Sequence, residues 1–198
     1  MSSTYAKIAF TPAVRAVQAA HGSAALYART VSGEGREGTE LSPREAGFLE
    51  ASDGIFVATV GETGWPYVQF RGGKPGFLKV IDEQTIAYAD YRGNRQYITT
   101  GNLGHDDRVS ILAIDFARRK RLKLLGRASI IHDTDVIAYL NGTGAPEAER
   151  AIVIHVEAFD WNCPQHIPVR LTDSEYGDEI SRLTDRIAEL ERQQLTMA

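Results

Sequence analysis

Two polar side chains, Gln69 and Arg71, lie two positions apart in a short predicted strand. Because successive side chains of a strand point to opposite faces, these two leave the same face. Polar groups at such a position need a partner, which is either a bound ligand or solvent. Two lysines follow closely, Lys74 and Lys79, and either can add a second positive charge to the same site.

A second candidate for anion binding is the segment Gly93–Tyr97, which follows a predicted strand and opens a predicted short helix. Unpaired amides and the positive end of the helix dipole suit a terminal phosphate at such a place. Asn94 is expected to cap this helix, while the guanidinium of Arg95 binds the anion. The alternative interpretation is an ordinary capped turn with a surface arginine.

A basic cluster occupies positions 118–121 and ends with Arg121 at the edge of a predicted strand. In an acidic chain, and without interleaved aromatic residues, it indicates a solvated turn and not a nucleic-acid site. Arg121 itself is placed where its side chain can reach a pocket. Further along, the proline-bounded run 161–168 holds Trp161, Gln165 and His166. Such a rigid loop either lines a substrate pocket or serves as a structural crossover.

Three further patterns favour no specific chemistry. Cys163 and His166 are close in sequence, but this spacing is poor evidence for a nucleophile and its base. Positions 33–38 spell G-x-G-x-x-G without the preceding strand that a dinucleotide site requires, so we expect a flexible loop there. The five histidines show no i, i+4 pairing typical of metal ligands, and we expect no metal site.

The composition is that of a globular protein with one well-buried core: 198 residues, 43% hydrophobic and 24% charged. The net charge of −4 gives no general attraction to nucleic acid or to anionic membranes. A single cysteine allows no intrachain disulfide. No stretch has the character of a signal peptide or of a membrane helix, so we expect a cytoplasmic protein without a membrane partner.

The elements that must position these residues are mostly short strands joined by turns. Six or seven strands are expected, at 55–60, 66–71, 77–81, 85–89, 109–115, 122–131 and 151–159. Helices are expected after the cap-and-proline pairs Thr11-Pro12 and Ser42-Pro43, and from Asp133 to Leu140. Because the strands rarely alternate with helices, the pattern favours a mainly β (α+β), antiparallel barrel with peripheral helices.

Near the C-terminus, four apolar residues recur at spacings of three and four: Ile180, Leu183, Ile187 and Leu190. This is an amphipathic helical stripe with the period of a coiled coil. It either packs within a dimer of this chain or docks on another protein. With this helix the chain divides into an N-terminal helix and loop extension (1–41), a barrel (42–172) and a C-terminal helix (173–198).

Three segments carry a resemblance to a known family. They are 64–73 (Gly-Trp-Pro-Tyr-Val-Gln-Phe-Arg-Gly-Gly), 76–82 (Gly-Phe-Leu-Lys-Val-Ile-Asp) and 90–97 (Asp-Tyr-Arg-Gly-Asn-Arg-Gln-Tyr). Their order and spacing resemble those of the pyridoxamine 5′-phosphate oxidase-like FMN-binding proteins, and the run 162–167 is similar to the tail of one subgroup. The resemblance covers about residues 45–170. It implies a split barrel that binds FMN at the interface of a homodimer.

The resemblance also implies roles for individual residues. The flavin phosphate would be bound by Arg71, Lys79 (or Lys74), Asn94 and Arg95. The isoalloxazine ring would lie along Gln69 and Phe70, and Arg121 would reach this ring from the partner subunit. Asp90 belongs to the same cofactor-binding set. The vitamin B6 oxidases themselves carry a C-terminal signature of tryptophan and arginine that binds the substrate phosphate. Here only Arg170-Leu171 resembles it, so pyridoxamine phosphate is not the expected substrate.

Two functions on this fold remain open. The first is an FMN-dependent oxidoreductase acting on a small molecule, with a reduced nicotinamide or another donor supplying electrons and the flavin carrying the chemistry. The second is a non-catalytic carrier or sensor that binds flavin or haem, with His155 or His166 as the haem ligand. The related families imply that a deazaflavin also fits this barrel.

Overall fold

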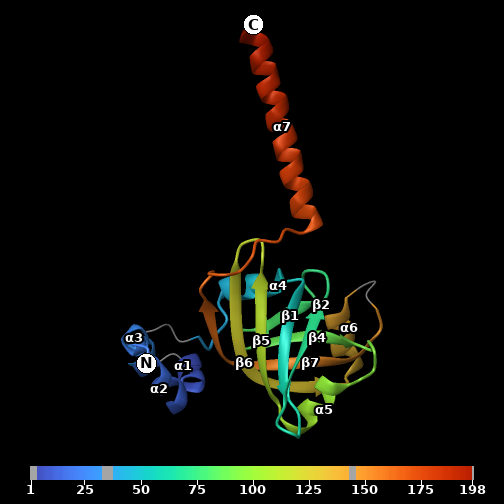
Figure 1. Ribbon diagram of the computed structural model, residues 1–198. Coiled ribbons are helices and arrows are strands. Elements are labelled where there is room, and N and C mark those ends of the chain that lie inside the picture. Colours follow the sequence, from blue (N-terminus) through green and yellow to red (C-terminus); the bar gives the residue numbers. More distant parts are fainter. Residues whose placement is uncertain (1–3, 33–37, 143–145, 198) are drawn as a thin grey trace. The chain divides into compact units, whose positions relative to one another are not determined.

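The computed structural model describes residues 4–32, 38–142 and 146–197. Its strands form one seven-stranded sheet in the order β2-β1-β5-β6-β7-β4-β3 (Figure 1). The strands are β1 (Gly54–Val60), β2 (Pro66–Gly72), β3 (Leu78–Asp82), β4 (Thr85–Tyr91), β5 (Arg108–Asp115), β6 (Lys120–Ile131) and β7 (Ala148–Asn162). The helices are α1 (Thr4–Ala9), α2 (Pro12–Ala20), α3 (Ala24–Ser32), α4 (Pro43–Glu50), α5 (Ile98–His105), α6 (Thr134–Asn141) and α7 (Asp173–Met197).

The chain divides into two compact units. The first contains residues 1–114 and 121–162, and therefore nearly the whole sheet with α1 to α6. The second contains residues 115–120 and 163–198, which are the β5–β6 turn and the C-terminal segment with α7. Within this second unit, Arg118 forms ion pairs with Asp115 and Glu175. In the described ranges, no helix is both long enough and apolar enough to cross a lipid bilayer.

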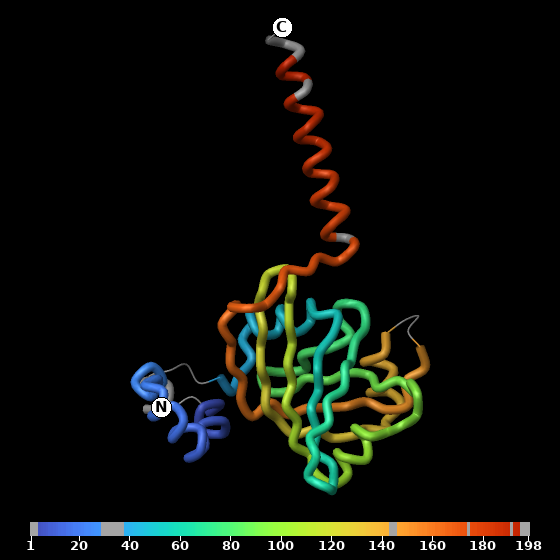
Figure 2. Tube along the Cα trace, viewed as in Figure 1, coloured from blue at the N-terminus to red at the C-terminus, as the bar shows by residue number. Residues whose placement is uncertain are grey.

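The register of the strands explains how the sheet forms a split barrel. β1 pairs antiparallel with β2 and β5, and β7 pairs antiparallel with β6 and β4. β2 and β3 are the outer strands, so the sheet is not closed. The long strands β6 and β7 shift register between Leu125 and Gly126, where an added Cβ at Gly126 would lie 2.4 Å from the carbonyl oxygen of His155. Figure 2 follows the chain through this sheet. The predicted mainly β split barrel with peripheral helices is confirmed.

The two faces of the sheet bury different clusters. The inner face carries the main core, whose largest fully buried side chains include Tyr88, Leu49, Ile55, Leu78 and Ile86. The opposite face carries a smaller cluster under α6, formed by Ala87, Ala89, Leu140 and Ala151. Because Tyr88 and Ala87 are consecutive in β4, the alternation of strand side chains assigns every β4 residue to one face or the other.

The helix starts predicted from caps are confirmed. At α2 the side chain of Thr11 accepts a hydrogen bond from the amide of Val14 at 3.4 Å, and at α4 Ser42 forms a capping box with Glu45. At α6 Asp133 accepts hydrogen bonds from two amides of the first turn, and the helix ends at Gly142 with a φ of +69°. α1 and α3 are not predicted from the sequence, because neither begins with the cap-and-proline pair that marks α2 and α4.

The helix after β4 begins later than predicted. α5 starts at Ile98, and its N-cap is Tyr97, which has a φ of +52° and makes no side-chain cap hydrogen bond. The prediction that Asn94 caps this helix is therefore wrong. The Oδ1 atom of Asn94 instead accepts a hydrogen bond from the amide of Gln96 at 3.2 Å, which closes a turn before the helix. The predicted loop with the G-x-G-x-x-G pattern, at 33–38, lies almost entirely outside the described residues.

The C-terminal end of β7 is fastened to α4 by a buried carboxylate. Nε1 of Trp161 donates a hydrogen bond to Oε1 of Glu45 at 2.6 Å, and the Trp161 ring packs edge-on against Phe48 with ring centroids 4.8 Å apart. The amide of Ser42 donates to Oε2 of Glu45 at 3.2 Å. Burial raises the pKa of the Glu45 carboxyl, but hydrogen bonds from Ser42 and Trp161 outweigh it, so this pKa lies below 4.5.

We expect the substitution Glu45→Gln to destabilise the protein by about 1–2 kcal/mol at pH 7, because hydrogen bonds to a charged acceptor are lost. A carboxyl whose pKa is lowered by folding stabilises the folded state above its unfolded pKa and loses this effect as the pH falls through the folded value. The difference from the parent chain should therefore shrink below about pH 4. Urea unfolding at several pH values measures it, with exposed Glu40→Gln as the control; a pH-independent difference would contradict this account.

Candidate functional site

Arg71 on β2 meets a carboxylate and a second arginine at the ends of β4 and β7. Its Nε lies 3.4 Å from Oδ1 of Asp90, and Nε of Arg150 lies 3.6 Å from Oδ2 of the same residue. The side chains of Asp90 and Arg150 are each 10% exposed, and that of Arg71 is 20% exposed. Asp90 faces Arg150 in the β4–β7 register, whereas β2 is a neighbour of neither strand, so Arg71 reaches across the barrel. These three residues are called the arginine–aspartate cluster below.

Arg150 connects this cluster to the first turn of α5. Its Nη1 donates a hydrogen bond to Oγ1 of Thr100 at 3.2 Å, and its guanidinium carbon lies 4.9 Å from the centre of the Tyr97 ring. The first amides of an α-helix have no partner within the helix, and α5 has no side-chain cap to satisfy them. The positive end of α5 and a buried guanidinium are therefore adjacent, which is an arrangement suited to an anion.

Glu149 supplies a second carboxylate to this region. It forms ion pairs with Arg150 and with Arg92, the latter at 3.8 Å between Nε and Oε1. It also accepts a hydrogen bond from the hydroxyl of Tyr97 at 3.2 Å. With Arg71 included, three guanidiniums stand against two carboxylates, which leaves a net charge of +1 (3 − 2). An anionic ligand would balance this charge.

Burial dominates the protonation of the groups in the arginine–aspartate cluster. It raises the pKa of the Asp90 carboxyl above 3.8, although the guanidiniums of Arg71 and Arg150 oppose the rise. It also raises the pKa of the neighbouring Tyr88 hydroxyl to about 12, again against the charge of Arg71. Tyr88 is therefore a neutral hydrogen-bonding group at physiological pH. The ionised form of Asp90 is costly, which indicates that the cluster is not arranged for stability alone.

The arginine–aspartate cluster and the first turn of α5 contain buried hydrogen-bond donors that the described residues do not satisfy. The Nε atoms of Arg71 and Arg150, and Oγ1 of Thr99 in the first turn of α5, are buried and form no hydrogen bond within the described residues. Both Nε atoms face Asp90 at ion-pair distance, but a buried donor that lacks a hydrogen bond is still unfavourable, and an added acceptor can satisfy it. Guanidiniums together with helix amides are the donor set that recognises phosphate groups. The residues present therefore fit a phosphate-bearing cofactor.

The predicted ring-contacting residues leave β2 on opposite faces. Gln69 is half-buried on the Arg71 side, where its Oε1 accepts a hydrogen bond from the hydroxyl of Tyr67 at 2.5 Å. Phe70 points to the other face and is 56% exposed. Its ring covers Gly54 and Gly72, where an added Cβ would come within 2.2 and 2.6 Å of ring atoms. The prediction that Gln69 and Arg71 share a face is confirmed, and Phe70 belongs to a separate surface.

Within the described residues, no contact links the other predicted phosphate ligands to Arg71. Lys79 is paired with Ala87 and so leaves the sheet on the face of α6, where its Nζ lies 5.5 Å from the centre of the Tyr139 ring. Asn94 and Arg95 are exposed in the turn before α5, and Arg95 has a φ of +60°. Lys74 is exposed in the β2–β3 connection.

The remaining predicted site residues are Arg121, Trp161, Gln165 and His166. Arg121 pairs with Asn162 in the β6–β7 register, is half-buried, and has a buried Nε without a hydrogen-bond partner in the part of the chain that is described. Trp161 packs on α4, as described above. Gln165 and His166 belong to the second unit; the amide of Gln165 donates to Sγ of Cys163 at 3.4 Å, and His166 is exposed with a φ of +65°.

Sequence reasoning missed Arg150 and Thr100 as parts of the site, and it named Tyr97 only as the end of the candidate segment Gly93–Tyr97. A signal for Arg150 existed, because Glu149-Arg150 is a charged pair at the start of a run of apolar residues that forms a buried strand. Charged residues are almost never buried unless they are paired. No comparable signal marked Tyr97 or Thr100, since their roles depend on where α5 begins.

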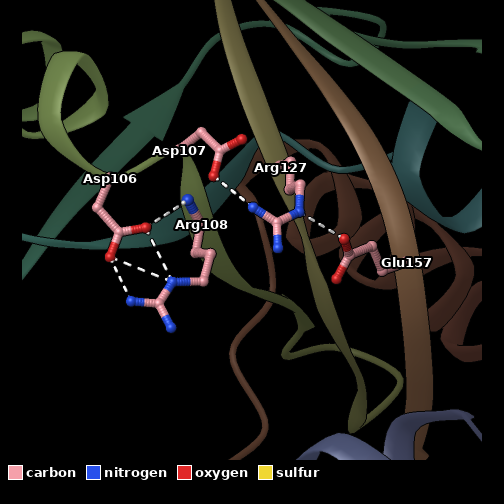
Figure 3. A network of polar contacts seen from close by, with 5 residues as sticks. All are labelled: Asp106, Asp107, Arg108, Arg127 and Glu157. Atoms are coloured by element: carbon pink, nitrogen blue, oxygen red, sulfur yellow. Dashed lines mark hydrogen bonds and ion pairs between the residues drawn. The ribbon is translucent and has the colours of Figure 1, made fainter.

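The chain also offers an exposed network of similar chemistry for comparison. Arg127 on β6 pairs with Asp107 and Glu157, each at 2.7 Å, and Arg108 pairs with Asp106 (Figure 3). The side chain of Arg127 is half exposed. Ion pairs at such exposure contribute less than about 1 kcal/mol because solvent screens them. This network provides matched controls for substitutions in the arginine–aspartate cluster.

Comparisons with known proteins agree with the architecture. Residues 41–162, which include the whole sheet, match the family model of pyridoxamine 5′-phosphate oxidase. A tagged form of HupZ from Group A Streptococcus is similar in structure, with 18% identity over 66% of this chain and 99% of that chain and a TM-score of 0.51. A single-residue variant of the same protein gives 16% identity over 62% and 99% of the two chains and a TM-score of 0.52. No curated protein matches the chain.

The likeness to HupZ shows the fold, a split β-barrel with an open seven-stranded sheet. The family model covers more than half of the sequence. The chain belongs to the pyridoxamine 5′-phosphate oxidase family.

Replacing Arg150 by Met should destabilise the protein by about 3 kcal/mol at pH 8, because it leaves the buried Asp90 carboxylate with one cation fewer. The pKa of Asp90 is already raised, so the carboxyl is neutral below its folded pKa and needs no countercharge there. The cost should therefore decrease as the pH falls through the folded pKa of Asp90, which lies above 3.8. Urea unfolding measures both effects. The control Arg127→Met, at a solvent-screened ion pair, should cost much less than Arg150→Met at either pH; equal costs for the two substitutions would disprove the special role of the cluster.

Proposed function

We propose that this chain binds FMN at the interface of a homodimer and acts as an oxidoreductase on a small molecule. The observation that carries the proposal is the arginine–aspartate cluster adjoining the uncapped start of α5. A net positive charge, buried donors that form no hydrogen bond in the described residues, and a helix start without a side-chain cap all favour a phosphate group at this place. Family membership supports the choice of a flavin.

In this proposal Arg71 and Arg150 hold the flavin phosphate, and Asp90 keeps the two guanidiniums from repelling each other. Thr100 and Tyr97 fix the position of Arg150 through the contacts described above. Because the α5 amides and the arginines are already in place, little reorganisation is needed on binding. Asn94 and Arg95, exposed in the preceding turn, are in a segment that can add donors to the same phosphate.

The isoalloxazine ring would be tuned by the polar residues proposed from the family. Gln69 can donate a hydrogen bond through its amide, and Arg121 has an unpaired buried Nε that can donate to an oxygen or nitrogen of the ring edge. We propose that Arg121 does so from the partner subunit. A bound flavin supplies the electron or hydride transfer itself, so the protein needs to bind, orient and exclude water.

An exposed aromatic platform on β1 and β2 supports the homodimer. Phe56 and Phe70 are cross-strand partners with ring centroids 5.5 Å apart, and both are exposed, as is Val68 beside them. Gly54 and Gly72 lack the Cβ atoms that would prevent the Phe70 ring from lying flat against the strands. An apolar surface of this kind favours a protein interface. We infer that a second copy of the barrel covers it.

The purified protein should be yellow, with an absorption band near ~450 nm, and should release FMN on denaturation. Arg71→Met should weaken FMN binding about 10- to 100-fold, since a charged hydrogen bond contributes about 1.5–3 kcal/mol. Arg108→Met, which removes an exposed arginine that pairs with Asp106 outside the arginine–aspartate cluster, serves as the control and should leave FMN affinity unchanged. A colourless protein that does not take up added FMN would overturn the proposal.

Spectra of the same purified protein distinguish an oxidoreductase from a non-catalytic carrier or sensor. Bleaching of the band by a reduced nicotinamide or another donor, followed by reoxidation, would identify an oxidoreductase. A flavin that no donor reduces would identify a carrier or sensor, a Soret band would identify haem, and a shifted spectrum of the released molecule would identify a deazaflavin.

The dimer proposal can be tested through flavin retention. Val68→Asp places a charge on the aromatic platform and should reduce the flavin kept after desalting by at least about tenfold, because a desolvated charge opposes association and the site then loses the partner's arginine. Val136→Asp on α6, which changes a surface residue of similar type outside the platform, should retain the flavin. Full retention in the Val68 variant would show that the platform is not the interface.

A further inference from the structure

The C-terminal helix α7 presents an apolar stripe that nothing in the described chain covers. α7 has 25 residues, and every residue from 180 to 190 is exposed. The stripe consists of Ile180, Leu183, Ile187 and Leu190, which are 62%, 46%, 57% and 43% exposed. Helices in water owe most of their stability to packing of such a face. A helix this long with its apolar face in solvent therefore requires a partner.

We propose that α7 pairs with α7 of a second copy of this chain to form a parallel two-stranded coiled coil. The spacings of three, four and three place isoleucine at two a positions and leucine at two d positions of the heptad. Isoleucine or valine at a with leucine at d favours two parallel strands over higher oligomers. The order found here, Ile180 and Ile187 at a with Leu183 and Leu190 at d, is the dimer pattern.

Charge favours the parallel over the antiparallel arrangement. In the heptad set by Ile180, the arginine at 186 occupies a g position beside the apolar seam. An antiparallel pair that aligns Ile180 with Leu190 of the other copy would place the two Arg186 side chains opposite each other. Like charges at that distance repel. A parallel pair separates them on the two sides of the seam, so each keeps its bond to Glu189 of its own helix.

The charge of α7 argues against a lipid surface as the occupant. Between residues 173 and 197 the chain has seven carboxylates and three arginines, a net charge of −4 (3 − 7). Helices that bind membrane surfaces are rich in Lys and Arg on the polar face, because cell membranes are anionic. An acidic helix would be repelled. A second copy carries the same net charge, but part of it is compensated within each helix, where oppositely charged neighbours such as Glu179 and Arg182 are paired, and only a second copy brings a matching apolar stripe.

The apolar stripe is short, since residues 180–190 span only about one and a half heptads, and its pairing benefits from a dimeric barrel. If the barrels associate as proposed above, the two tails are held at an effective concentration in the millimolar range, which converts weak pairing into stable pairing. This step rests on the proposed function; the heptad pattern and the charge argument do not. Pairing of α7 and binding of flavin are therefore measured separately in the cross-linking experiment.

Disulfide cross-linking of the full-length protein tests the proposal. In a Cys163→Ser background, which removes the sole cysteine, Ile187→Cys places one thiol at an a position. Residues at equivalent a positions face each other only in a parallel dimer, and a disulfide requires Cα atoms within about 7 Å. Mild oxidation at micromolar concentration should convert most of this variant into covalent dimer. The control Asp185→Cys, two residues away on the outer side of the helix, should cross-link at least tenfold less.

Several outcomes would overturn the proposal. Equal cross-linking of the two variants would mean random collision. Cross-linking of Leu183→Cys chains to Ile187→Cys chains, without Ile187→Cys homodimers, would mean an antiparallel pair. Co-sedimentation of the parent protein with phosphatidylcholine–phosphatidylserine vesicles, abolished by Ile187→Asp, would mean a lipid partner. Flavin absorbance recorded on the same samples distinguishes the two proposals: cross-linking without flavin contradicts only the proposed function, and flavin without cross-linking contradicts only the coiled coil.

Discussion

The carboxylate of Asp90, held between the guanidiniums of Arg71 and Arg150, is the interaction on which the site depends. It joins three strands, of which β2 is not hydrogen-bonded to β4 or β7, so it links the outer strand β2 to strands on the other side of the sheet order. Burying an ion pair gains little net stability, because the desolvation of each charge offsets their attraction. The raised pKa of Asp90 is a sign of this cost. Removing one partner of the cluster is costly, but the assembled cluster gains little over apolar packing, so it is best explained by what its surplus positive charge can bind.

Much of the fold is predictable because its signals are local. The β1–β2 and β3–β4 hairpins follow from short apolar runs separated by turn residues, and α2, α4 and α6 follow from side-chain caps at Thr11, Ser42 and Asp133. Each of these signals involves neighbours within four residues. The start of α5 has no such signal: Asn94 looks like a cap, but its side chain closes an earlier turn, and Tyr97 in a left-handed conformation takes the N-cap position.

The site was predictable only in part, because its assembly depends on register. Arg71 and Asp90 can both be named from the sequence, but their contact requires the sheet to curl. Lys79 shows the converse, since pairing with Ala87 sends it to the face opposite Tyr88 and Asp90. One residue of register decides the face of every side chain in a strand. The sequence shows Arg150 as a charged residue at the start of a buried run, but its pairing with Asp90 follows only from the register of β7 with β4.

The acidity of α7 has a consequence for the behaviour of the protein in solution. The whole chain carries a formal charge of −4, and the segment 173–197 alone carries −4, so the other residues sum to zero. Near neutral pH, molecules without net charge have no long-range repulsion and tend to precipitate at high concentration. The net charge that opposes association of this chain therefore resides in α7, which forms no part of the sheet.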